Sequence, residues 1–259
     1  MSAPRMAWLS RIGIRAGRSS CKTPVQVEAL SPRGPRARAQ NYSRVVARAR
    51  MRSNGPTRRR GIEMFVQVFQ AKIRDADLWA RQVEKWRTEI QPKTTGFLGF
   101  TSGISADGYM ITVVRFKSQE TAQIDNDLPE QGAWFEETSK AFDGEVTFHD
   151  CREVDVLLDG GSNDAGFVQV MQGRAKDQEQ MRTQEKEMQS ELHKVRPDLI
   201  GGITAWHGDG DFTQVAYFTS EQETRQNEQA MAQSPVYEQF MSLIDGDLTF
   251  YDLTKPDLN

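Results

Sequence analysis

The chain of 259 residues is long enough for one large domain or for two of ordinary size. Residues 1–63 hold 15 of the 33 Lys and Arg but 2 of the 36 Asp and Glu, which leaves 18 basic against 34 acidic residues in 64–259. The net negative charge of residues 64–259 therefore argues against nucleic-acid binding by this part of the chain. Two cysteines exclude a disulfide framework, and no run approaches the ~18 apolar residues of a membrane span, so we expect a cytoplasmic protein with no membrane partner.

Residues 1–63 combine Pro, Gly, Ser and Arg with little apolar periodicity, so we interpret them as a disordered Arg-rich segment. Three explanations stay open. The segment is a basic arm for nucleic acid, an organelle transit peptide, or upstream sequence outside a mature protein that begins at Met64 or Met51. Intact mass of the native protein separates the third explanation from the others.

The remainder of the chain repeats itself. The strand-like stretch "FVQV" at 65–68 returns at 167–170, and "DGEVTFHD" at 143–150 returns as "DGDLTFYD" at 245–252, both at a spacing of 102 residues. "FKS" at 116–118 matches "FTS" at 218–220 at the same spacing. Three anchors at one spacing predict two copies of a unit of about ninety residues.

Each copy begins with a β-rich stretch followed by a helix. In the first copy, Asp75 is a predicted N-cap, and Trp79, Val83, Trp86 and Ile90 fall on one helical face. In the second copy, Met181, Met188 and Leu192 keep that face, although Glu185 interrupts it. A hairpin, a helical region in two pieces and a final strand follow, with predicted helix starts at Ser118, Pro129, Ser220 and Pro235.

The order β-α-β-β-α-β, occurring twice, predicts an α+β protein built from tandem ferredoxin-like units. We place the first domain at 64–156, a Gly- and Asp-rich linker at 157–165 and the second domain at 166–259. Helices cover one face of each antiparallel sheet, so the two open faces are predicted to close on each other as an intramolecular, pseudo-dimeric barrel. The protein is then a monomer, with further self-association open.

These junctions resemble a known group of proteins. "VVRFKSQETA" from Val113 and "VAYFTSEQET" from Val215, together with the helix that follows each and the final strand, are similar to the antibiotic biosynthesis monooxygenase-like domains of the dimeric α+β barrel superfamily. The resemblance covers 64–259 in two copies. It implies anything from a cofactor-free oxygenase for phenolic or quinol substrates, through haem degradation, to a domain without activity.

Two departures from that group bear on activity. Its active members commonly carry Asn and Trp four residues apart on the third strand, where this chain has Thr112 and Phe116, then Gln214 and Phe218. A haem-degrading relative would carry an axial histidine within 118–142 or 220–244, and neither stretch contains one. We therefore transfer no catalytic residue from the resemblance and expect no cofactor.

Histidines supply the first candidates for chemistry. His207 ends a strand beside Trp206, where it is either a base at a barrel mouth or a surface residue. His149 corresponds to Tyr251, and alternation places the two on equivalent sheet faces, where they would bracket a ligand if that face lines the barrel. With Gln214, these residues form the candidate catalytic set: His149, His207, Gln214 and Tyr251.

A second set consists of candidate ligand-binding residues: Gln67, Gln169, Trp134, Trp206 and Thr112. Gln67 and Gln169 share a face with apolar neighbours, so each needs a partner, which is either a cross-strand residue or a ligand. Trp134 either packs in the core or walls a pocket between helix and sheet. No phosphate-binding loop follows a strand, and no metal-ligand spacing occurs, so no metal is predicted.

Two functions fit these features. The first is a small-molecule-binding barrel that acts as a cofactor-independent oxygenase on an aromatic or quinol-type substrate. The second is a non-catalytic ligand-binding or stress-related barrel module. An open cavity near His149 or Trp206 favours the first function, whereas a filled interior favours the second.

Overall fold

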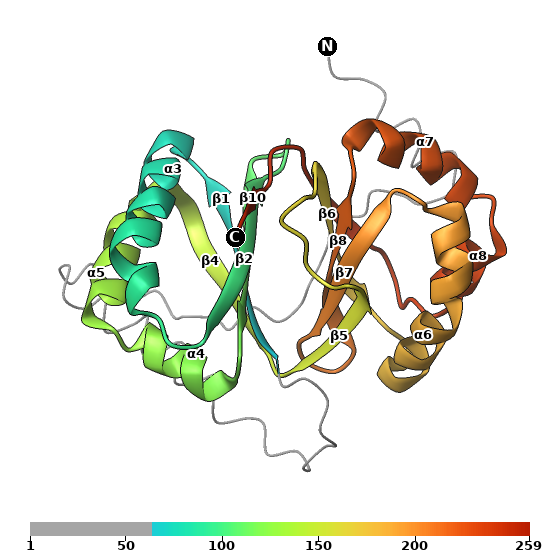
Figure 1. Cartoon of the computed structure of the whole chain (residues 1–259), viewed down its shortest axis with the longest axis horizontal. Helices are drawn as coiled ribbons and strands as arrows, with labels where there is room; N and C mark the ends of the chain where they lie inside the picture. The colour runs from blue at the N-terminus through green and yellow to red at the C-terminus, as the bar shows by residue number, and fades with distance from the viewer. Residues whose placement is uncertain (1–63) are drawn as a thin grey trace. The chain divides into compact units, whose positions relative to one another are not determined.

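The computed structural model describes residues 64–259, and the predictions for residues 1–63 lie outside that range. The described chain divides into two compact units (Figure 1). The first unit runs to Val154 and also contains Asp257–Asn259, and the second unit is Asp155–Pro256. Each unit has its own five-stranded antiparallel sheet with helices on one face.

The first unit has the predicted β-α-β-β-α-β order. Its sheet runs β10-β2-β3-β1-β4. Asp75 caps the first helix by accepting a hydrogen bond from the Leu78 amide, and Ser118 forms a capping box with Thr121 at the start of α4. The elements are β1 (Phe65–Ile73), α3 (Ala76–Lys85), a π-helical turn (Trp86–Ile90), two 3₁₀ turns (Gln91–Lys93 and Ser139–Ala141), β2 (Phe97–Ile104), β3 (Tyr109–Phe116), α4 (Gln119–Asn126), α5 (Pro129–Thr138), β4 (Phe142–Cys151) and β10 (Asp257–Leu258).

The second unit repeats this order, with sheet order β5-β7-β8-β6-β9. Asp177 and Ser220 cap its first two helices through their side chains. Its elements are β5 (Glu153–Leu158), β6 (Phe167–Arg174), α6 (Gln178–Val195), β7 (Leu199–Trp206), β8 (Asp211–Phe218), α7 (Glu221–Met231), α8 (Pro235–Ser242) and β9 (Thr249–Leu253). The ferredoxin-like order is therefore confirmed in both copies.

Each sheet carries an additional edge strand that the repeat pattern does not predict. β5 forms the edge of the second sheet beside β7, and β10 forms the edge of the first sheet beside β2. β5 ends at Leu158, so it extends into the stretch 157–165 where the sequence predicts a linker. The domain boundaries and the closure of the two sheets into a barrel stay predictions.

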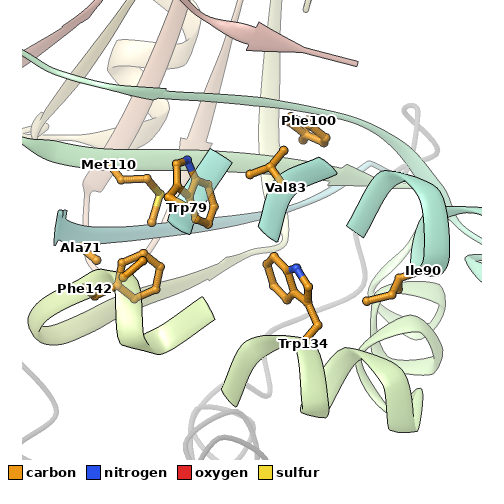
Figure 2. Close-up of a cluster of buried hydrophobic side chains, with 9 residues drawn as sticks. Ala71, Trp79, Val83, Ile90, Phe100, Met110, Trp134 and Phe142 are labelled. Carbon is orange, nitrogen blue, oxygen red and sulfur yellow. The ribbon is translucent and has the colours of Figure 1, made fainter. Parts of the chain in front are cut away.

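The core of the first unit lies between its sheet and its helices. Trp79 and Val83 on α3 are 6–7% exposed and pack with Trp134 on α5 and Phe142 on β4 (Figure 2). The Trp79 and Phe142 ring centroids are 5.8 Å apart. The helix periodicity read from the sequence is thus confirmed by burial, because Ile90 is also buried and Trp86 packs against the same cluster.

The two faces of the first sheet differ in the side chains that they carry. Phe69, Phe100 and Val114 point towards the helices. Residues paired directly in antiparallel strands share a face, and His149 pairs with Val68. Since successive residues of a strand alternate, His149 lies on the face away from the helices, whereas Gln67 lies on the face towards them. Phe69 and Phe100 therefore belong to the helix-covered face of the sheet.

Candidate functional site

The first unit contains a pocket between the helix-bearing face of its sheet and the helices α3, α4 and α5. Figure 2 shows part of its wall, where Trp79, Val83 and Trp134 face the sheet. Half of the lining residues are aromatic. Eight rings contribute to it: Phe69, Trp79, Trp86, Phe100, Phe116, Trp134, Phe135 and Phe148.

The pocket encloses little free volume. The concavity with its open mouth has about 780 Å³ of empty volume, but only about 80 Å³ is open to the centre of a water molecule. A single water needs roughly 10–15 Å³ by that measure, so the space holds several waters or one thin group. This limited volume therefore suits a compact, planar group better than a bulky or branched compound.

Contacts between aromatic rings fix the walls. Trp86 lies edge-on to Phe97 at 5.1 Å and to Phe100 at 6.0 Å between ring centroids. On the other side, Phe148 stacks on Phe69 at 5.9 Å and lies 5.7 Å from Phe135. Such pairs contribute about 0.5–1.5 kcal/mol each beyond the area that they bury, so the walls are pre-organised.

Most polar groups of the pocket are already paired within the protein. Gln67 Nε2 donates to Asp150 Oδ1 at 2.8 Å, and Gln67 Oε1 accepts from Asn126 Nδ2 at 3.2 Å. The hydroxyls of Ser102 and Thr112 bond to each other at 2.6 Å. Gln67 is thus occupied on both sides of its amide, so it connects β1 with β4 and α4.

Gln131 is different because only one side of its amide is used. Trp86 Nε1 donates to Gln131 Oε1 at 2.9 Å. An indole N–H is a donor only, so the oxygen of the amide must face Trp86 and the NH₂ group must point away from it. Among the residues that the structure describes, Gln131 Nε2 has no hydrogen-bond acceptor. Gln131 therefore contributes to the pocket lining an oriented amide whose NH₂ group is unused within the described residues.

Three of the predicted residues of the first unit meet at this pocket. Gln67, Thr112 and Trp134 all line it, although Gln67 and Thr112 are paired and the indole of Trp134 donates to the Gln82 carbonyl at 2.6 Å. His149 does not join them, because it lies on the other face of the sheet. Its pairing with Tyr251 would join two units and stays a prediction.

The predicted residues of the second unit are held in separate hydrogen bonds. His207 Nε2 lies 3.0 Å from the Thr213 hydroxyl, and Trp206 Nε1 donates to Asp155 Oδ2 at 2.7 Å. Gln169 Nε2 donates to Asp252 Oδ1 at 2.9 Å and to Glu228 Oε1 at 3.3 Å. Tyr251 pairs with Val170 across β9 and β6, on the face away from the helices.

Gln214 leads to a residue that sequence reasoning did not select. Its Nε2 donates to Glu185 Oε1 and to Thr204 Oγ1, both at 2.9 Å. Burial and then the charge of Asp155 raise the pKa of Glu185 to about 7, against the bond from Gln214 and the charge of Arg182. The sequence does contain a signal for Glu185, because this residue interrupts the apolar face of its helix. Nothing in the sequence distinguishes Gln131 in the same way.

Two further properties concern the described residues only. Within 64–259, no group of three or more His, Cys, Asp and Glu residues is arranged to hold a metal ion. No helix in the same range is long and apolar enough to cross a membrane.

Comparisons with known proteins give the fold. No protein-family model matches the sequence, and no curated protein matches it. A candidate monooxygenase from Lactobacillus acidophilus NCFM aligns at 11% identity and a TM-score of 0.57 over 76% of this chain and 99% of its own. A candidate monooxygenase from Fusobacterium nucleatum aligns at 9% identity and a TM-score of 0.59 over 76% of this chain and 95% of its own. An anthrone oxidase-like protein aligns at 9% identity and a TM-score of 0.55 over 76% of this chain and 93% of its own.

These structures align along both repeats of the chain, and likeness at such low identity establishes the fold alone. The strand order of each unit agrees with it. The chain has the α+β fold of these structures, with two ferredoxin-like units in one polypeptide.

Proposed function

We propose that the first unit binds a flat, apolar ring compound that carries a hydrogen-bond acceptor, and that Gln131 Nε2 orients this compound. The observation that carries the proposal is the unused amide donor in a pocket with little free volume lined by eight aromatic side chains. Ligand sites commonly combine apolar walls with a few placed polar groups. The aromatic rings supply contact area, and the single donor supplies orientation.

Gln131 is suited to this role because both the helix that carries it and its side-chain amide are held in place. The side chain comes from α5, whose Trp134 anchors the helix to α3 by donating to the Gln82 carbonyl. The amide is then turned by Trp86, which also forms part of the wall. A ligand oxygen that accepts from Nε2 therefore meets a donor that needs no reorientation.

A matched pair of tricyclic compounds tests the proposal, namely fluorenone, which carries a ketone oxygen, and fluorene, which does not. We expect the wild-type chain to bind fluorenone about three- to tenfold more tightly, the value of one net hydrogen bond. Gln131→Glu keeps an oxygen for Trp86 but removes the NH₂ donor, so the preference should disappear. Quenching of tryptophan fluorescence gives the dissociation constants.

Gln229→Glu, on the exposed surface of α7, makes the same change of charge and serves as the control. Circular dichroism of each variant reports whether the fold is kept. Equal binding of the two compounds by the wild type, or an unchanged preference in Gln131→Glu, would overturn the proposal.

A cofactor-independent oxygenase is the second candidate, supported by the fold shared with candidate monooxygenases and an anthrone oxidase-like protein. In this function the electron-rich ring of the substrate reacts with dioxygen while the pocket positions it. Anthrone has a ketone on flat fused rings, which suits both the Gln131 donor and the aromatic walls. Oxygen uptake with anthrone and a panel of quinols tests this candidate, and binding without uptake leaves the first unit a binding module.

A further inference from the structure

At positions equivalent to part of the aromatic pocket, the second unit carries polar side chains. Three residues that line the pocket of the first unit, Val83, Ser102 and Thr112, have counterparts at the repeat spacing of 102 residues. The counterparts are Glu185, Thr204 and Gln214, and these three form one hydrogen-bonded chain. The same place in the fold therefore carries a carboxylate in one unit and apolar walls in the other.

Glu185 has no cation of its own in this arrangement. Arg182, one turn earlier on α6, is held by Asp155 through Nε at 2.6 Å and Nη2 at 2.8 Å. Asp155 in turn also accepts from the Trp206 indole. Among the described residues, no ion pair reaches Glu185, and only its Oε1 accepts a hydrogen bond. The second carboxylate oxygen is available to a ligand.

Even a half-buried carboxylate without a counter-ion is costly, so such groups are usually paired, neutralised or functional. When Glu185 is ionised, it and Asp155 carry two negative charges against the one positive charge of Arg182. Met181 and Met188 lie one turn away on each side of Glu185 on α6, and both are buried. The surroundings thus combine a net negative charge with flexible apolar side chains.

We propose that the second unit contains a second ligand site, in which Glu185 binds the protonated amine of a small organic cation. The ammonium group donates to Glu185 Oε2, the carboxylate oxygen that accepts no hydrogen bond from the described residues. Gln214 and Thr204 hold the carboxylate in position through Oε1. The long-range field agrees, since residues 64–259 hold 34 acidic and 18 basic side chains and attract cations. This site is independent of the ring-binding pocket in the first unit.

The test compares n-butylammonium with 1-butanol, which has a similar length but no charge. We expect calorimetric titration of the full chain at pH 8 to detect binding of n-butylammonium and none of 1-butanol. Because the ligand needs ionised Glu185, its affinity should fall about tenfold between pH 8 and pH 6. Of the charged groups around the carboxylate, Asp155 on β5 raises the pKa and Arg182 on α6 lowers it.

Glu185→Gln keeps the size of the side chain and should abolish binding, whereas Glu187→Gln on the exposed side of the same helix should not. Equal binding of the two compounds, pH-independent affinity, or unchanged binding by Glu185→Gln would each overturn the proposal. If Glu185→Gln does not fold, the wild-type measurements alone decide.

Discussion

Gln67 on β1 donates a hydrogen bond to Asp150 on β4, and its counterpart Gln169 donates to Asp252 across the same pair of strands in the second unit. The two bonds measure 2.8 and 2.9 Å. Each glutamine also meets a side chain of the following helical region, Asn126 in the first unit and Glu228 in the second. The glutamine that opens each repeat is therefore a strand-to-helix connector, and in Gln169 both amide hydrogens are used in this role.

Replacing the partner of Gln67 tests this connecting role. Asp150→Leu leaves the half-buried amide of Gln67 without its acceptor, so the free energy of unfolding should fall by about 1–3 kcal/mol. Asp150→Asn retains an oxygen in the same place and should cost clearly less. Urea unfolding monitored by circular dichroism measures both variants. Equal losses for Leu and Asn would mean that the hydrogen bond contributes little.

The raised pKa of Glu185 predicts a stability that depends on pH. The pKa in the folded chain is about 7, above the ordinary value of 4.5, so the protonated form favours folding. This contribution is fully present below pH 4.5 and is lost as pH rises through 7. We expect the unfolding free energy of the wild type, relative to Glu185→Gln, to fall by about 1–3 kcal/mol from pH 4.5 to pH 8, the partial exposure of the side chain reducing the effect.

Urea unfolding of both proteins at a series of pH values gives this difference. Glu187→Gln, which changes an exposed carboxylate of the same helix, is the control and should follow the wild type at every pH. A difference between wild type and Glu185→Gln that stays constant with pH would refute the prediction.

The edge strand β10 pairs with β2 and covers the backbone groups along that edge of the first sheet. Phe100 exchanges two backbone hydrogen bonds with Asn259, of 2.8 and 3.0 Å, and Arg87 pairs with Asp257. Removing residues 257–259 leaves the edge of β2 unpaired, which should lower the stability of the first unit by about 1–3 kcal/mol and promote association. Hydrogen exchange should speed up at the Phe100 amide and stay unchanged at Ile203 in the second unit. Unchanged exchange at Phe100 would show that β10 is dispensable.

A glycine permits the corresponding edge contact in the second unit. A Cβ atom on Gly201 would overlap the backbone carbonyl of Gly160, which belongs to the chain that follows β5. Gly201→Ala should therefore destabilise the chain by about 1–3 kcal/mol through displacement of that backbone. Gly132→Ala is the matched control, because nothing lies within 4 Å of its added methyl and the position is helical. Thermal unfolding should show a loss for the first variant and a gain of up to about 1 kcal/mol for the second. A tolerated Gly201→Ala would contradict the close approach.

Local sequence features were sufficient to predict most of the secondary structure. Asp75 and Ser118 cap helices where the sequence placed them, and Trp79, Val83 and Ile90 are buried at helical spacing. These features succeed because caps and periodicity depend on residues within a few positions of each other. The edge strands β5 and β10 escaped prediction, since a short edge strand is defined by the strand that it docks against.

The two copies, their β-α-β-β-α-β order and the helix faces follow from the amino-acid sequence, because repetition, capping and periodicity are local properties of the chain. Which polar side chains are hydrogen-bonded within the protein, and which are not, depends instead on tertiary packing. The partners of Gln67 lie 83 and 59 residues away, and the indole that orients Gln131 lies 45 residues away. Hydrogen bonds at such separations depend on how helices and strands pack. The amide of Gln67 is therefore hydrogen-bonded within the protein, whereas Gln131 Nε2 and Glu185 Oε2 have no partner among the described residues.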